Sequence, residues 1–158
     1  MGRIIAIANQ KGGVGKTTTS INLSACLAEK NKKVLTIDID PQGNTTSGLG
    51  IDKNEVENTV YELLLGECEL EDCITSCIME NLDVIPSNIN LSGAEIELIS
   101  IENKEFLLKD LLTDLKDKYP NLKFSYEMAD IRNMNDLYEL LKQFKNYDEL
   151  ITQVNIMH

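Results

Sequence analysis

The chain has 158 residues, enough for one domain with its own core but too few for two full domains. Its hydrophobic content of 42% is ordinary for a globular protein and excludes disorder throughout. A formal charge of −11 repels nucleic-acid backbones over most of the surface, so any such contact must be local or come from other sequence.

Four cysteines and one histidine make a poor structural metal site. Zinc sites usually present two close pairs of ligands, whereas Cys26 falls in an apolar helical stretch and the histidine is the last residue, His158. We therefore expect ordinary thiols. The N-terminus carries no charged region followed by a long apolar run, and no stretch approaches membrane-spanning length. These features favour a cytoplasmic protein with no membrane segment.

The first forty residues predict a strand, a glycine-rich turn, a helix and a second strand. Residues 3–8 and 34–39 are short apolar runs typical of strands buried on both faces of a parallel sheet. Residues 17–31 between them have the length and apolar content of a helix. This order predicts an α/β fold in which helices flank a parallel sheet.

The remaining pattern predicts shorter elements. The expected strands are residues 82–86 and 122–126, and the expected helices are residues 58–65, 70–77, 91–99, 103–118 and 134–144. The last residues are too few to classify. We expect a truncated sheet that stops after three strands, whose unpaired edge and uncovered apolar face would drive self-association into a dimer or larger assembly.

The glycine-rich turn has the composition of a phosphate-binding loop. Consecutive backbone N–H groups can converge on phosphate oxygens only where side chains do not obstruct them, and Gly12, Gly13 and Gly15 provide such a stretch. A helix that starts near Lys16 points its positive end at the phosphate. The lysine can reach the β- and γ-phosphates, and the Thr17 hydroxyl can bind Mg²⁺. The expected nucleotide contacts are Gly12, Gly13, Val14, Gly15, Lys16, Thr17 and Thr18.

Two carboxylate residues lie at the end of the second predicted strand. Asp38 and Asp40 alternate along it, so both side chains emerge on one face at the carboxyl edge of the sheet, where ligands bind in open α/β folds. Carboxylates beside a polyphosphate require Mg²⁺ or ordered water between them. We therefore expect one to organise the water shell of the metal and the other to orient the attacking water, although both could simply be solvated caps on a strand end.

The sequence KGGVGKTT at residues 11–18 departs from the strict phosphate-loop motif, because Gln10 stands where that motif has its first glycine. It resembles the deviant Walker A signature of the ParA/MinD group of P-loop ATPases, in which an early lysine, here Lys11, reaches the partner's nucleotide across a dimer. DIDPQGN at residues 38–44 and SGLG at 47–50 resemble ParA/Soj-type proteins, as do LDVIPS at 82–87 and LSGAEIEL at 91–98.

This resemblance covers roughly residues 1–115 and implies catalytic roles for Lys11, Lys16 and Asp40, with Thr17, Asp38 and Asp40 around the metal. It also implies that residues 42–46 form a nucleotide-sensitive switch. ParA-type proteins form ATP-dependent homodimers, bind DNA without sequence preference, and hydrolyse ATP when a ParB-like partner stimulates them. The implied cofactors are ATP and Mg²⁺, and the implied function is chromosome or plasmid partitioning.

The resemblance stops after residue 118. ParA-type proteins continue with a strand that reads YDxIIIDxPP, whose aspartate supports the magnesium water shell, and this sequence has no such segment downstream. We therefore divide the chain into a partial ATPase domain, residues 1–118, and an unassigned tail, residues 119–158. FSYEMADIRNMNDL at residues 124–137 faintly resembles the extended short-chain nucleotide-sugar epimerases. The alternative to an active ATPase is a nucleotide-binding remnant or fusion that hydrolyses ATP poorly or not at all.

Overall fold

A computed structural model describes residues 3–9, 11–97 and 149–154. These residues form a five-stranded sheet with the strand order β1-β5-β2-β4-β3. Its strands are β1 Arg3–Ala8, β2 Val34–Ile39, β3 Thr75–Ser76, β4 Leu82–Ile85 and β5 Glu149–Val154. All neighbouring pairs are parallel except β3 and β4, so the expected α/β fold with a parallel sheet is confirmed, with one short antiparallel edge.

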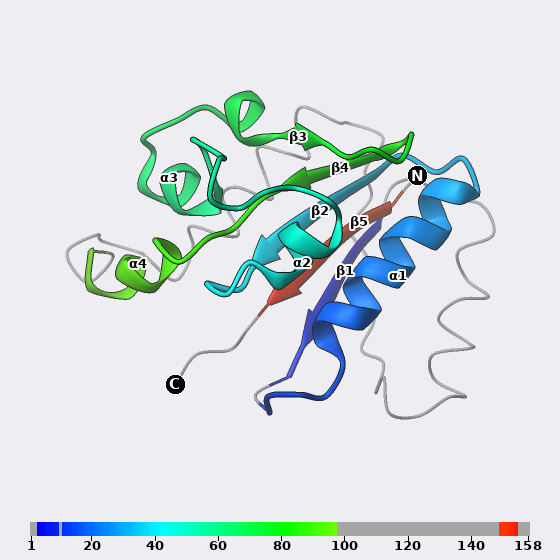
Figure 1. Cartoon of the computed structure of the whole chain (residues 1–158), viewed down its shortest axis with the longest axis horizontal. Coiled ribbons are helices and arrows are strands. Elements are labelled where there is room, and N and C mark those ends of the chain that lie inside the picture. The colour runs from blue at the N-terminus through cyan, green and yellow to red at the C-terminus, as the bar shows by residue number, and fades with distance from the viewer. Residues whose placement is uncertain (1–2, 10, 98–148, 155–158) are drawn as a thin grey trace.

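The strand β5 comes from the end of the described chain and lies between the two N-terminal strands (Figure 1). It pairs along its whole length with β1 on one side and β2 on the other. The expectation that the sheet stops after three strands is therefore wrong. The local signal for this strand is weak, because ELITQV mixes three polar residues with three apolar ones instead of forming the apolar run expected of a strand with two neighbours.

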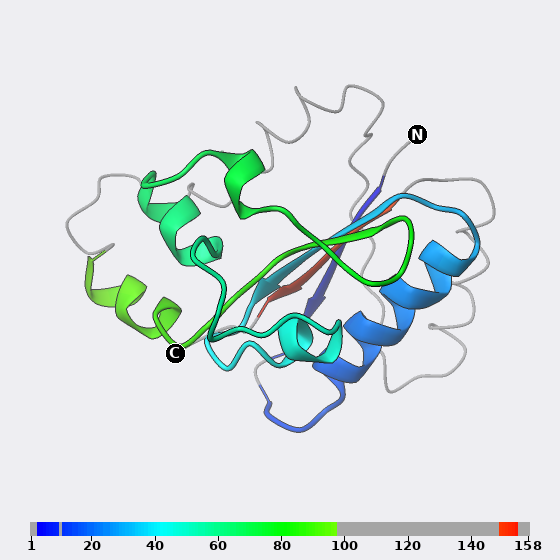
Figure 2. The same cartoon turned by 45° about the horizontal axis from the view of Figure 1, so that its top comes forward.

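The helix α1, Lys16–Glu29, follows the glycine-rich loop and packs on one face of the sheet. Beyond Lys16, its buried positions recur at helical spacing and are small or aliphatic, which allows a close approach to the strands. The Ser24 and Thr36 hydroxyls lie 2.8 Å apart in this buried contact between α1 and β2. Figure 2 shows α1 beside the sheet, with the short helix α2, Asn44–Gly48, near its N-terminal end.

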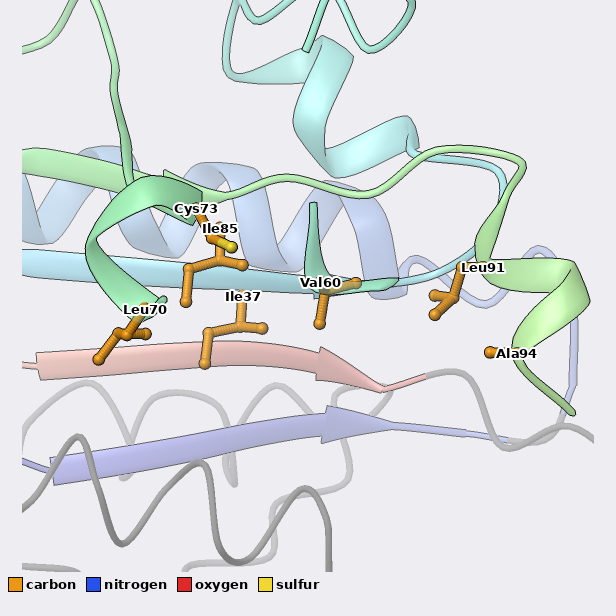
Figure 3. Packing of buried hydrophobic residues seen from close by; sticks show 7 residues of the cluster. All are labelled: Ile37, Val60, Leu70, Cys73, Ile85, Leu91 and Ala94. Atoms are coloured by element: carbon orange, nitrogen blue, oxygen red, sulfur yellow. The ribbon is translucent and has the colours of Figure 1, made fainter. Parts of the chain in front are cut away.

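The opposite face of β2 and β4 is covered by three short elements, α3 Val60–Leu65, the 3-10 helix η1 Leu70–Cys73 and α4 Leu91–Glu97. Figure 3 shows the core between these elements and the strands. It consists of Ile37, Val60, Leu70, Cys73, Ile85, Leu91 and Ala94. Because Ile37 and Val34 fall in separate clusters on the two faces, β2 is buried on both sides, as its apolar run predicts.

The predicted elements between residues 58 and 97 are confirmed with one correction. The helix near residue 60 begins after a capping box formed by Thr59 and Glu62, and the strand after Asn81 and the helix from Leu91 lie where expected. The helix predicted for residues 70–77 is wrong beyond Cys73, because Thr75 and Ser76 instead pair with β4. The elements predicted for residues 103–118, 122–126 and 134–144, the domain boundary near residue 118 and the epimerase-like segment lie outside the described residues.

Candidate phosphate-binding site

The glycine-rich loop between β1 and α1 has an open interior. Gly13 and Gly15 adopt φ angles of +68° and +92°, a region that residues with a side chain rarely occupy. Apart from its chain neighbours, a methyl group placed on Gly12, Gly13 or Gly15 would meet no atom of the described residues within 4 Å. Gly15 is the N-cap residue of α1 and has no side chain that could accept a hydrogen bond from the first backbone N–H groups of the helix. The loop therefore fits an anion such as phosphate.

The Lys16 side chain lies within this loop and is only 8% exposed. Its Nζ donates a hydrogen bond of 3.2 Å to the backbone oxygen of Lys11, at the start of the loop. Lysine ammonium groups are seldom buried unless they have an anionic or strongly polar partner. An anion held by the loop amides would supply that partner, and the role of Lys16 in binding it stays a prediction.

The other predicted loop contacts differ in exposure. Lys11 is exposed, and its backbone N–H donates a 2.9 Å hydrogen bond to the Asn9 side chain. Thr17 is half-buried in the first turn of α1, whereas Thr18 is exposed. Val14 is half-buried in the loop itself. Thr17 therefore stands beside Lys16 at the positive end of the helix, where a metal bound to a phosphate would lie within reach of a hydroxyl.

Asp38 is fully buried on β2, and hydrogen bonds engage both of its carboxylate oxygens. One oxygen accepts from the backbone N–H of Asp40 at 3.2 Å. The other accepts from the Thr46 backbone N–H at 2.9 Å and from the Thr46 hydroxyl at 2.8 Å. Burial raises the pKa of Asp38 above its ordinary value, while the bonds from Thr46 act in the opposite direction. This carboxylate thus anchors the first turn of α2.

Asp40 lies just after the end of β2 and is 6% exposed. Its carboxylate accepts a 3.0 Å hydrogen bond from the Gln42 backbone N–H, and its backbone oxygen accepts one of 2.8 Å from Gly43. These bonds fold the chain into the tight turn that leads to α2. Because β1, β5 and β2 run parallel, Asp40 and the glycine-rich loop leave the sheet at the same edge, as the sequence predicts.

The segment from Gly43 to Gly48 is held against two neighbours. Gly43 has a φ of +58°, and a methyl group on it would collide with the backbone oxygen of Ser87, just beyond β4. A methyl group on Gly48 would meet the side-chain end of Ile21 on α1. Thr46 completes the contact, because its hydroxyl accepts a 2.9 Å hydrogen bond from the Ser87 backbone N–H. Sequence reasoning did not assign these roles to Thr46 and Ser87, and the only local signal was the density of small and glycine residues.

The Ser87 hydroxyl is fully buried and has no hydrogen-bond partner among the described residues. An unpaired buried hydroxyl costs about 1–3 kcal/mol, and alanine removes the hydroxyl without adding an atom. We therefore expect Ser87→Ala to raise the melting temperature by a few degrees, about 4 °C for each kcal/mol in a chain of this size. Thermal unfolding followed by circular dichroism measures this shift. A lower melting temperature would mean that the hydroxyl has a stabilising partner.

Among the described residues, no group of three or more His, Cys, Asp or Glu side chains could hold a metal ion. A magnesium ion at this edge would therefore depend on phosphate oxygens and water for most of its six ligands.

Cys68 and Cys73 are free thiols with sulfur atoms 2.6 Å apart, and burial raises the pKa of Cys73. No helix in the described part of the chain has both the length and the apolar character needed to cross a membrane.

Comparison with known proteins gives consistent matches. Residues 2–124 match the AAA_31 family, an AAA domain. The chain is 58% identical over 119 residues to the sporulation initiation inhibitor protein Soj of Bacillus subtilis. The matched residues make up 75% of this chain and 47% of that protein. It is 47% identical over 119 residues to the chromosome partitioning protein ParA of Myxococcus xanthus, across 75% of this chain and 42% of that protein. The chain thus spans less than half the length of these curated relatives.

Solved structures agree with the fold. The cobyrinic acid a,c-diamide synthase of Mycobacterium smegmatis, crystallised with an ATP analog and magnesium, superposes with a TM-score of 0.71. The two sequences are 28% identical, and the match covers 96% of this chain and 72% of that one. The described architecture, a mostly parallel sheet with flanking helices, is that of the P-loop ATPases.

Proposed function

Because the chain belongs to the AAA_31 family and is of the ParA/Soj type over its N-terminal three quarters, we propose that it binds ATP with Mg²⁺ and hydrolyses it. This activity would serve the partitioning of chromosomes or plasmids, the class to which its relatives belong. The observation that carries the proposal is the open glycine loop at the end of β1, with the buried Lys16 ammonium folded into it.

We assign a role in this reaction to each of the predicted residues. The backbone N–H groups of residues 12–18 would surround the β-phosphate, with Lys16 neutralising charge on the β- and γ-phosphates. Thr17 would bind the Mg²⁺, which polarises the γ-phosphate when bound, and Asp38 would support its water shell. Asp40 would orient the attacking water, and Lys11, which is exposed, would be free to reach a second subunit.

The alternative, a protein that binds nucleotide but hydrolyses it poorly, has one specific observation in its favour. The strand between β1 and β2 carries no acidic residue after Glu149, and Gln153 is the residue in register with Asp38. A neutral residue at that position leaves the metal site with fewer carboxylates than the sequence resemblance implies. ATP binding and ATP turnover are therefore tested separately.

We expect Lys16→Ala to weaken Mg-ATP binding by roughly 10- to 150-fold, because hydrogen bonds to charged groups contribute about 1.5–3 kcal/mol. Isothermal titration calorimetry measures the loss. Lys30→Ala is the matched control, since it removes the same charge from the exposed far end of α1 and should bind like the wild type. Equal affinities for the wild type and Lys16→Ala, or no heat from the wild type, would contradict the proposed site.

Phosphate release then separates the two functions. Turnover by the wild type that falls in Asp40→Ala, with binding retained, supports an ATPase. Tight binding without phosphate release, even with DNA and a ParB-like protein added, supports the hydrolysis-deficient alternative.

We also propose the assembly and setting that the family implies. These are an ATP-dependent homodimer, a ParB-like partner protein, contact with non-specific DNA and a cytoplasmic location. The net charge of −11 opposes DNA binding over most of the surface, so that contact would need a local basic region. Light scattering with and without Mg-ATP tests the dimer, because a monomer under both conditions would contradict it.

A further inference from the structure

The Thr46 side chain joins three parts of the molecule. Its hydroxyl donates to the Asp38 carboxylate at 2.8 Å and accepts from the Ser87 backbone N–H at 2.9 Å, while its own backbone N–H donates to Asp38 at 2.9 Å. Asp38 belongs to β2, Thr46 to α2, and Ser87 follows β4. All three residues are fully buried. Water therefore cannot readily replace these hydrogen bonds. Their loss would leave the buried Asp38 carboxylate and the buried Ser87 backbone N–H without a hydrogen-bond partner that each has now.

These contacts fix the position of the turn that carries Asp40. Residues 40–43 run from the end of β2 to the start of α2, so both ends of the turn are held when Thr46 is held. The same Asp38 carboxylate also accepts from the Asp40 backbone N–H. The close approach of Gly43 to the Ser87 backbone oxygen closes the contact from the other side. A shift of α2 away from Ser87 would consequently move Asp40.

We propose that Thr46 is a positioning residue for the ATPase reaction, acting through its hydroxyl to hold Asp40 at the edge where the γ-phosphate would lie. This inference rests on the proposed ATPase function. The Thr46 hydroxyl and backbone N–H form hydrogen bonds with Asp38 and Ser87, and its backbone oxygen accepts from Leu49 and Ile51. None of these partners belongs to the glycine loop. Thr46 should thus affect the chemical step much more than nucleotide affinity, because misplacing a catalytic group by about 1 Å can cost roughly 100-fold in rate.

The test compares the turnover of three variants with substitutions at two neighbouring positions, Thr46 and Ser47. Thr46→Val keeps the shape but removes the hydroxyl, and we expect it to lower kcat by roughly 10- to 100-fold with KM for ATP changed less than about threefold. Thr46→Ser retains the hydroxyl and should recover most of the rate. Ser47→Ala alters the exposed neighbour on the same short helix and should behave like the wild type.

Hydrogen exchange measured by mass spectrometry provides a second readout that does not need turnover. Thr46→Val should exchange faster across residues 40–48 and at residues following β4, with β1 and α1 unchanged. A general loss of packing would instead raise exchange everywhere and lower the melting temperature of Thr46→Val. That outcome, or wild-type kcat and exchange in Thr46→Val, would overturn the inference. If the wild type itself releases no phosphate, the ATPase proposal fails. Faster exchange of Thr46→Val across residues 40–48 would then still support the role of Thr46 in holding this turn, and unchanged exchange would refute that role.

Discussion

Replacing Ile151 by proline should lower the free energy of unfolding by more than about 3 kcal/mol, a large share of the 5–15 kcal/mol typical of a domain. Ile151 lies in the middle of β5, in register with Ile5 on one side and Thr36 on the other. Proline cannot donate a backbone hydrogen bond and is found almost only on edge strands. Because β5 is the only described link between β1 and β2 in the sheet, its disruption separates the two strands that carry the site.

Urea unfolding followed by circular dichroism measures this loss. Thr75→Pro is the comparison, since β3 is a two-residue edge strand that pairs on one side only, and we expect a much smaller effect there. Similar unfolding midpoints for the wild type and Ile151→Pro would show that β5 is not a central strand.

Gly43→Ala should destabilise the protein by about 3 kcal/mol and lower turnover as well. Part of this cost is the left-handed backbone at φ +58°, about 1 kcal/mol for a residue with a side chain. The larger part is the collision with the Ser87 backbone oxygen, which cannot move without β4. The segment must then lift from Ser87 and carry Asp40 with it.

Gly66→Ala separates the two costs. Gly66 has a φ of +72°, so it shares the backbone penalty, but a methyl group there meets no atom of the described part of the chain within 4 Å beyond its own neighbours. We expect this variant to lose only about 1 kcal/mol and to keep its turnover. Equal losses in the two variants, measured by urea unfolding, would show that Gly43 does not press against Ser87.

The N-terminal half of the site could be predicted from sequence because local signals agree there. The apolar run of β1, the glycines and the helix from Lys16 are consecutive, so each element supports the assignment of the next. Asp40 follows β2 directly, and parallel pairing alone brings it to the same edge as the loop. These arguments need no knowledge of which strands are neighbours.

The strand order and the contacts of α2 could not be predicted in this way. Nothing local in Glu149–Val154 indicates two neighbours, and its place between β1 and β2 depends on pairing across more than a hundred residues. The five residues of α2 include two threonines and a glycine, a weak helical sequence that is held by Asp38 and Ser87. Tertiary contacts therefore decide both features.

The same strand order sets when the site can assemble during protein synthesis. The ribosome releases β1 and β2 early, but the strand that joins them in the sheet emerges last among the described elements. Until then the nascent chain exposes two apolar strands without their shared neighbour, a state that favours slow folding and aggregation. Chaperones that shield such strands during translation would consequently have most effect before residue 154 leaves the exit tunnel.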